Sequence, residues 1–286
     1  LFRSCGKNSC NRVCDVLARD VRCGTVARLV QSLVVLVKRS RRQHANRSSQ
    51  HRGFIRKNVA KHIPRHDHVK LFFPDAATGR LIKPEMTEHG LKFADDIKPI
   101  SRDYTPRLFD LDAKTLAIDF VIHDAGPATE WAQHAKIGDQ IAIGGPRGSM
   151  VIPMAYQHYV LIGDETALPA IARRLEELPA SAQATVVVEV NSSNDEITFK
   201  SAAKTQITWL HREGQASGQV TLFKQALESL SLPQHDYFIW VATETQVARQ
   251  LRKTLVEQYQ VAKDAIKAAG YWQHGTSNAH TVIDDE

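Results

Sequence analysis

The residues best suited to chemistry form one short run, Ser101-Arg102-Asp103-Tyr104-Thr105-Pro106-Arg107. Tyr104 supplies a flat ring and a phenol, and Thr105 supplies a hydroxyl and a backbone N–H group. Arg102 and Arg107 supply two permanent cations. Together these groups could stack on a planar heterocycle, hydrogen-bond its polar edge and neutralise a phosphate. Taken alone, such a run is more often an arginine-rich strand or turn.

A second candidate is the run Gly163-Asp164-Glu165-Thr166-Ala167-Leu168-Pro169-Ala170, which follows an apolar segment. Parallel sheets bind ligands at the carboxyl ends of their strands, beside helix N-termini. Gly163 would allow the turn, and the N–H groups that follow could hold a pyrophosphate. Glu165 stands where the dinucleotide fingerprint has its second glycine, so the nucleotide signal is weak. The alternative is an ordinary strand-to-helix turn.

The remaining polar candidates are single residues. Lys70 and Arg147 are cations near predicted turns, where such residues usually face solvent; in a cleft beside a flavin they would attract an anionic substrate. His123 ends a predicted strand and is more often structural than catalytic there. We find no hydrolase elbow and no Walker motif, and we expect no metal site and no catalytic side chain.

The segments that must position these residues fall into two patterns. Residues 68–149 contain short alternating strands and glycine turns, which predict a small antiparallel barrel. The expected strands are residues 68–73, 104–109, 115–123 and 141–143. A helix is expected to open in residues 126–132, with Pro127 in its first turn and Thr129 as its cap.

The pattern changes from residue 156, where apolar strands alternate with helices. We expect strands at residues 159–162, 184–190, 207–210 and 237–242, and helices at residues 167–178, 219–230 and 245–259. This alternation predicts parallel strands with right-handed crossovers, hence a doubly wound α/β domain. A barrel followed by such a domain, without acid–base pairs, indicates electron transfer through a bound cofactor that supplies the chemistry.

The charge of the chain is unevenly distributed. Of 37 Lys and Arg and 31 acidic residues in 286, residues 1–57 hold 14 bases and 2 acids, so the net charge of +6 belongs to this segment. The basic balance therefore does not indicate nucleic-acid binding by the body. All four cysteines lie in the first 23 residues, which favours a reducing cytoplasm over a disulfide framework. No apolar run is long enough to span a bilayer, and we expect no secretory signal.

These observations predict three segments. Residues 1–53 would be an atypical, poorly ordered basic leader, in which residues 13–37 could form an amphipathic helix. Residues 54–154 would form the barrel, and residues 155–286 the α/β domain with a C-terminal tail. The chain begins with Leu1, which suggests a fragment or an unusual start.

As a set, the motifs resemble those of the siderophore-interacting proteins, flavin-dependent ferric-siderophore reductases of the ferredoxin-reductase-like superfamily. The resemblance runs from about residue 68 to residue 275, with the motifs in family order. It is carried by the following runs: Arg102-Asp103-Tyr104-Thr105-Pro106-Arg107, Asp119-Phe120-Val121-Ile122-His123, Gly126-Pro127-Ala128-Thr129-Glu130-Trp131-Ala132, Gly145-Pro146-Arg147-Gly148-Ser149, Gly163-Asp164-Glu165-Thr166-Ala167-Leu168-Pro169-Ala170 and Gly270-Tyr271-Trp272.

The resemblance implies a role for each motif in an FAD-binding barrel and an NADPH- or NADH-binding domain. The isoalloxazine and its phosphate would be held by Arg102, Tyr104 and Thr105. The ribityl chain would lie along Asp119, Val121 and His123. The pyrophosphate would be covered by Ala128, Thr129, Trp131 and Ala132. The nicotinamide nucleotide would be received by Gly163, Asp164, Glu165, Thr166, Ala167 and Pro169, with Tyr271 and Trp272 near the flavin or the nicotinamide. The anionic ferric chelate would be attracted by Lys70 and Arg147.

The implied function is reduction of a ferric siderophore, in which NAD(P)H reduces FAD, and the flavin reduces Fe(III) to the weakly held Fe(II). A general NAD(P)H:flavin oxidoreductase and a catalytically impaired flavin- or siderophore-binding protein are the alternatives. The second would follow if residues 1–53 supplied no barrel strands. Val190 is followed by Asn191 rather than an acid, which favours a 2′-phosphate paired with Arg173 or Arg212. We expect a cytoplasmic monomer without nucleic-acid or stable membrane binding.

Overall fold

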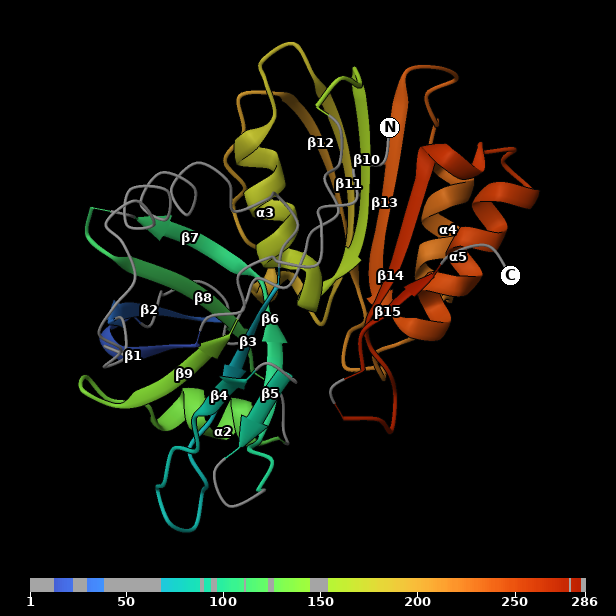
Figure 1. Ribbon diagram of the computed structural model, residues 1–286. Helices are drawn as coiled ribbons and strands as arrows, with labels where there is room; N and C mark the ends of the chain where they lie inside the picture. Colours follow the sequence, from blue (N-terminus) through green and yellow to red (C-terminus); the bar gives the residue numbers. More distant parts are fainter. Residues whose placement is uncertain are drawn as a thin grey trace. The chain divides into compact units, whose positions relative to one another are not determined.

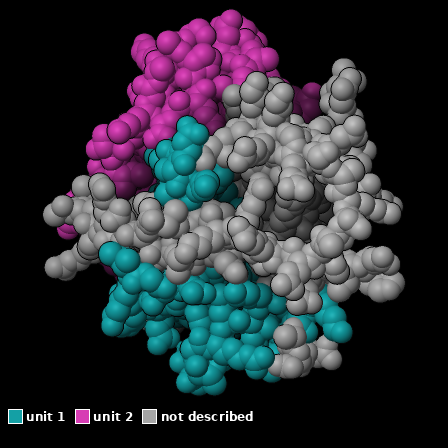
Figure 2. All heavy atoms as spheres, turned by 60° about the vertical axis from the view of Figure 1, so that its left-hand side comes forward, with its two compact units in different colours: residues 1–24, 31–152 teal, residues 25–30, 153–286 magenta. Residues whose placement is uncertain are grey.

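The computed structural model describes residues 13–22, 30–38, 68–87, 90–93, 97–110, 112–122, 126–144, 154–277 and 279–283. The chain divides into two compact units, which Figure 2 distinguishes by colour. Unit 1 comprises Leu1–Gly24 and Gln31–Ile152, and unit 2 comprises Thr25–Val30 and Pro153–Glu286. Each unit has its own sheet and its own apolar core, so each is described separately.

Unit 1 is built on a seven-stranded sheet with the strand order β6-β3-β9-β1-β2-β8-β7 (Figure 1). The ladders that β1 forms with β2 and β9, that β3 forms with β6 and β9, and that β7 forms with β8 are all antiparallel. The strands are β1 (Val13–Arg22), β2 (Val30–Lys38), β3 (Val69–Phe72), β6 (Ser101–Tyr104), β7 (Pro106–Asp110), β8 (Thr115–Val121) and β9 (Gln140–Gly144). A separate hairpin pairs β4 (Pro84–Thr87) with β5 (Gly90–Phe93).

The sheet of unit 1 curls toward closure at Thr105. Its two edge strands, β6 and β7, follow one another in the chain and are separated by this single residue. Since one residue spans only about 3.5 Å, the two edges of the sheet must approach each other here. The antiparallel barrel predicted from the short alternating strands is confirmed, although one strand was expected at residues 104–109 where the chain bends into two.

The prediction of an amphipathic helix in residues 13–37 is wrong, because β1 and β2 occupy this segment. Valine is frequent in both strands, and β-branched residues favour extended backbone even where their spacing also fits a helical period. The two strands lie at the middle of the seven-stranded sheet. Residues 13–22 and 30–38 therefore belong to the barrel sheet rather than to a separate leader, and they supply two of its strands.

Unit 2 is built on a six-stranded sheet with the order β12-β11-β10-β13-β14-β15, in which only β15 runs antiparallel. Its strands are β10 (His158–Asp164), β11 (Gln183–Val190), β12 (Lys204–His211), β13 (Tyr237–Glu244), β14 (Ile266–Trp272) and β15 (Thr281–Ile283). The four strands expected from the apolar runs are confirmed as β10 to β13. The last two were not predicted, because β14 follows a short 3₁₀ turn (Lys263–Ala265) rather than a clear loop signal.

Helices cover both faces of the sheet in unit 2, as Figure 1 shows, with α3 on one face and α4 and α5 on the other. The helices are α3 (Leu168–Glu177), α4 (Thr221–Ser229) and α5 (Thr245–Glu257). Apolar residues of α4 and α5, including Phe223 and Leu251, pack against β10, β11 and β13 in one core. The doubly wound architecture is therefore confirmed. None of the helices in the described parts of the chain has the length and apolar character needed to cross a bilayer.

Candidate functional site

In unit 1, Arg102 and Tyr104 lie two residues apart on β6 and so share one face of the strand. The Tyr104 ring centroid is 4.4 Å from that of Phe120, which belongs to the core. Burial raises the pKa of the Tyr104 phenol, so this group stays a neutral hydrogen-bond donor. Arg102 Nη1 donates to the Ser101 carbonyl at 2.8 Å. Both side chains are half-buried, leaving an aromatic ring and a cation together at the sheet edge.

Strand β8 separates its core residues from its candidate ligand residues by simple alternation. Leu116, Ile118 and Phe120 are buried, while Asp119 and Val121 lie on the opposite face. The Asp119 carboxylate lies 3.7 Å from Arg107 Nε on β7. The alternation places the two predicted ribityl contacts on one face. His123, the third predicted contact, lies outside the described residues.

Helix α2 (Pro127–His134) begins at Gly126, whose φ of 137° is in the region that favours glycine. No side chain of the described residues caps this helix, so the expected Thr129 cap is wrong. Because the first-turn N–H groups of an α-helix have no intrahelical acceptor, the amides of Ala128 and Thr129 need another partner. An anion beside Gly126 would meet this need.

The side chains of α2 point mainly into the core of unit 1. Ala128, Thr129 and Ala132 are buried, and the Trp131 ring lies 5.5 Å from Phe73 and 6.2 Å from Phe120, between ring centroids. Trp131 and Ala132 therefore help to anchor the helix. A ring platform, a phenol, an arginine and an uncapped helix start within one unit fit the parts of an FAD molecule.

Of the two cations predicted to attract the substrate, the structure describes only one. Lys70 on β3 lies opposite Asp103 on β6, and Lys70 Nζ is 2.7 Å from the Asp103 carboxylate. The charge of Lys70 is thus balanced by a neighbour rather than left for a substrate. Arg147 lies outside the described residues. Recruitment of an anionic chelate by these two residues stays a prediction.

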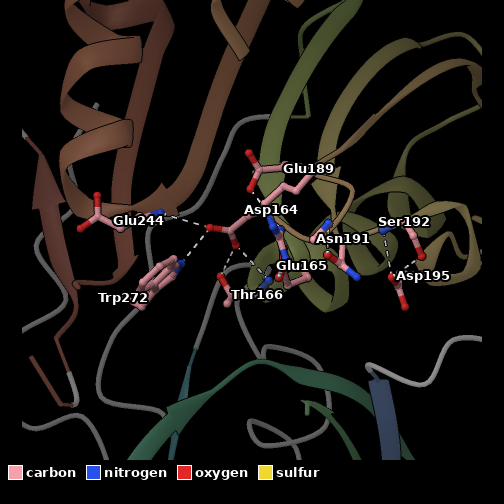
Figure 3. A network of polar contacts seen from close by, with 11 residues as sticks. Asp164, Glu165, Thr166, Glu189, Asn191, Ser192, Asp195, Glu244 and Trp272 are labelled. Atoms are coloured by element: carbon pink, nitrogen blue, oxygen red, sulfur yellow. Dashed lines mark hydrogen bonds and ion pairs between the residues drawn. The ribbon is translucent and has the colours of Figure 1, made fainter. Parts of the chain in front are cut away.

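In unit 2, Asp164 is the centre of a polar network at the carboxyl ends of three strands (Figure 3). Its Oδ1 accepts hydrogen bonds from the amide and the hydroxyl of Thr166. Its Oδ2 accepts from the Glu244 amide at 3.1 Å and from Trp272 Nε1 at 2.9 Å. This one buried carboxylate therefore ties the ends of β10, β13 and β14 together.

Arg212, which follows β12, forms a buried ion-pair triad with Glu165 after β10 and Glu189 on β11. Its Nη1 and Nη2 atoms each lie 2.7 Å from an oxygen of Glu165, which makes a bidentate pair. Arg212 Nη1 also lies 3.1 Å from Glu189 Oε1 on β11. Glu165 and Glu189 lie on elements far from Arg212 in the sequence, and all three side chains are buried. One cation thus pairs with two carboxylates near the carboxyl ends of the strands.

Glu244 caps α5 with its own carboxylate, which accepts from the Gln246 and Val247 amides at 2.6 and 3.1 Å. Behind it, Gly270 on β14 packs so closely on Thr245 that an added Cβ would lie 2.9 Å from the Thr245 Cα atom. Only glycine fits this position. The close approach brings the end of β14 to α5, where the Thr245 hydroxyl donates to the Trp272 carbonyl.

The structure changes several of the expectations for the nucleotide site. Glu165 turns into the Arg212 triad, and Ala167 and Pro169 are buried. Arg212 and Arg173, the two candidates for a 2′-phosphate, are paired with Glu165 and with Glu177 respectively. Both arginines therefore already have a carboxylate partner, and pairing of either with a 2′-phosphate stays a prediction.

Tyr271 and Trp272, both expected near the flavin or the nicotinamide, have different surroundings at the end of β14. Trp272 reaches Asp164, whereas the Tyr271 ring packs 6.0 Å from Trp240, between centroids. Sequence reasoning did not single out Glu189 or Glu244 as site residues. The available signal was a glutamate at the end of an otherwise buried apolar strand.

Two of these carboxyl groups should make unit 2 less stable as the pH rises. Burial, aided by the charge of Glu165, raises the pKa of Asp164 from 3.8 to about 6. Burial also raises the pKa of Glu189 from 4.5 to about 7, although Arg212 opposes it. Between these values the folded chain holds protons that the unfolded chain would release, so the free energy of unfolding falls from about pH 4 to about pH 7.

Urea unfolding followed across this pH range measures the effect. Glu189→Gln should flatten the dependence, since an amide does not titrate. Asp236→Asn, which changes an exposed residue just before β13, is the matched control and should keep the wild-type slope. Equal slopes for the wild type and Glu189→Gln would show that Glu189 does not contribute.

Each unit contains a region that matches the model of a known protein family. Residues 57–150 match the siderophore-interacting FAD-binding domain, and residues 156–275 match the siderophore-interacting protein family. The NADPH-dependent ferric-chelate reductase of Escherichia coli K12 is 38% identical over 210 residues, covering 72% of this chain and 79% of that protein.

Two further relatives agree with these matches. The ferric vibriobactin reductase ViuB of Vibrio cholerae is 32% identical over 228 residues, covering 77% of this chain and 83% of that protein. Among solved structures, a siderophore utilization protein from T. fusca superposes with a TM-score of 0.78 at 34% identity. The superposition covers 94% of this chain and 95% of that one.

Proposed function

Because the chain belongs to the siderophore-interacting protein family, we propose that it reduces Fe(III) held in a siderophore, with NADPH as reductant and FAD as carrier. The observation that carries this proposal is the FAD-binding match over residues 57–150, the part of the chain in which the ring platform and the uncapped helix start lie together. The name of the E. coli relative supports NADPH, and two other relatives are named as reductases of particular ferric siderophores.

In unit 1, this chain would hold the flavin with groups that do not themselves react. Tyr104 would lie against the ring system, and its neutral phenol would donate a hydrogen bond to a polar edge. Arg102 would neutralise a phosphate, and the amides of Ala128 and Thr129 would donate to another at the start of α2. When bound, FAD accepts a hydride from NADPH and gives single electrons to ferric iron.

In unit 2, the parallel sheet would position the reductant at the carboxyl ends of β10, β13 and β14. Trp272 is held there by Asp164 and offers an indole face for stacking. The siderophore iron is substrate, and no protein ligand to it is required. Loss of the iron would follow from its reduction, since hard oxygen ligands hold Fe(II) more weakly than Fe(III).

The test uses the full-length purified chain. Flavin bands in the visible spectrum, bleached by NADPH and restored by a ferric siderophore in the absence of oxygen, are the expected result. A general NAD(P)H:flavin oxidoreductase would consume NADPH at a rate that is independent of the ferric chelate. A colourless chain that takes up no added FAD would favour the impaired binding protein.

The setting of this activity is also a proposal. We propose a cytoplasmic monomer that binds neither nucleic acid nor a membrane stably. The cysteine-free body is suited to a reducing compartment, and residues 58–286 carry more acidic than basic residues, which disfavours nucleic-acid binding. Light scattering of the purified chain would test the oligomeric state.

A further inference from the structure

Two of the donors that could hold a phosphate at the end of β10 are already engaged, and a third position has no donor. In doubly wound sheets, the backbone N–H groups at the helix start after the first strand hold a pyrophosphate. Here the Thr166 amide donates to Asp164 Oδ1 at 2.9 Å, and the Leu168 amide donates to the Glu165 carbonyl. Pro169 has no N–H group at all. A carboxylate of the chain therefore stands where the ligand phosphate would be expected.

A carboxylate of the protein also accepts from backbone amides after the neighbouring strand, β13. The first-turn amides of α5, after β13, donate to the carboxylate of Glu244. The 3₁₀ turn after β10 and the start of α5 after β13 are thus each capped by a negative side chain belonging to the protein. An incoming anion would have to compete with both of them.

The charges around Asp164 add to this effect. Its four hydrogen-bond donors are two amides, a hydroxyl and an indole, none of which carries a positive charge. The other acidic groups drawn in Figure 3 are Glu165, Glu189, Glu244 and Asp195, and the guanidinium of Arg212 is engaged by the first two. Among the described residues, no cation is paired with Asp164, and a buried carboxylate in this state repels a second anion more strongly than an exposed one does.

We propose that Asp164 is a specificity-determining residue whose carboxylate takes the place of a ligand phosphate at the end of β10 and so weakens binding of the dinucleotide pyrophosphate. The inference rests on the proposed use of a nicotinamide dinucleotide by unit 2. It assigns Asp164 a role opposite to the one that the sequence suggested, since the residue would limit the affinity for the cofactor rather than provide it.

The direction of the effect separates this role from a structural one. If Asp164 only held Trp272 and the Thr166 turn in place, its replacement would loosen the site and weaken dinucleotide binding. If its charge competes with the ligand, replacement by an uncharged side chain removes the repulsion and strengthens binding. Asp164→Ser is the informative variant, because serine also caps helix starts well but carries no charge. Asp164→Asn keeps the shape of the side chain.

The experiment measures the dissociation constant of NADP⁺ by calorimetry on the full-length, FAD-loaded chain, so that no turnover is needed. For Asp164→Ser and Asp164→Asn we expect a dissociation constant lower by about tenfold at low salt, a size typical of removing one like charge from a binding site. Asp236→Asn removes the same charge at the amino end of β13, opposite to the carboxyl end that Asp164 occupies, and should bind as the wild type does. Unchanged or weaker binding by both Asp164 variants would overturn the proposal.

A measurement on the wild type covers the case in which neither variant folds. ADP-ribose carries the pyrophosphate but no group that titrates near neutral pH. Burial raises the pKa of Asp164 to about 6, so about half of this carboxylate is neutralised as the pH falls from about 8 to about 6. Glu189, whose pKa is raised to about 7, also gains a proton over this range, so the same measurement is made on Glu189→Gln, which should keep the rise. The affinity for ADP-ribose should rise over this range, and a flat or falling affinity would count against the proposal.

Failure of the proposed function gives a different pattern. In that case neither NADP⁺ nor ADP-ribose binds to any form of the chain, and NADPH does not bleach the flavin. The inference about Asp164 then falls with it. Binding by the wild type without a gain in the variants would instead leave the reductase intact and remove only the role of Asp164.

Discussion

Replacing Arg212 by alanine is expected to lower the free energy of unfolding of unit 2 by roughly 3–5 kcal/mol. The guanidinium is buried and makes a bidentate pair with Glu165 and a third contact with Glu189. Without it, two carboxylates remain largely buried without the cation that they share, and Glu189 is almost fully shielded from water. The lower stability comes mainly from the cost of leaving these carboxylates unpaired, rather than from losing the attraction of the ion pair.

Chemical denaturation, followed by tryptophan fluorescence, measures this loss. Arg173→Ala is the matched control, because Arg173 also pairs with a glutamate, Glu177, but at the partly exposed surface of α3. Such pairs contribute roughly 0.2–1 kcal/mol. A triple variant with Glu165→Gln, Glu189→Gln and Arg212→Met should recover much of the stability, since no buried charge is then unpaired. Equal losses for Arg212→Ala and Arg173→Ala would refute the assigned burial cost.

Arg102→Ala is expected to lower the affinity of unit 1 for FAD by roughly 1.5–3 kcal/mol, which corresponds to a dissociation constant about 10- to 150-fold higher. The side chain lies on β6, on the same face as Tyr104, and donates to the Ser101 carbonyl. Within the described part of the chain it forms no ion pair, so a phosphate could bind it without displacing a carboxylate. The deleted contact is a hydrogen bond to a charged group.

Flavin content per chain, read from the visible spectrum after desalting, checks this result. Arg80→Ala changes an exposed arginine of the loop before β4 and should retain FAD as the wild type does. Arg102→Lys should fall between the two, because lysine keeps the charge but loses the fork geometry. Unchanged FAD occupancy in Arg102→Ala would remove Arg102 from the flavin site.

Much of unit 2 was predictable because its signals are local. Strands β10, β11 and β13 are near-continuous apolar runs, as expected for parallel strands covered on both faces, and the helices between them end within a few residues of the expected limits. The motif residues at Gly163–Asp164 also lie where the rule for parallel sheets places a ligand, at the carboxyl end of the first strand.

The first two strands of unit 1 could not be assigned from local patterns. Their apolar residues fit a helical period, and the basic residues around them suggested a leader. Pairing with β9 on one side and with β8 on the other decided their conformation, and both partners lie about 80 or more residues further along the chain. Sheet membership depends on such distant partners, which no window of sequence contains.

The sequence by itself determined the family of motifs, the order of a barrel and an α/β domain, and the residue types at both candidate sites. Only the tertiary structure decided how those residues are used. Asp164 meets Trp272 from 108 positions away, and Arg212 meets Glu165 from 47. Whether a carboxylate receives a ligand or takes its place depends on which donors surround it, and those donors are brought together only when the strands align.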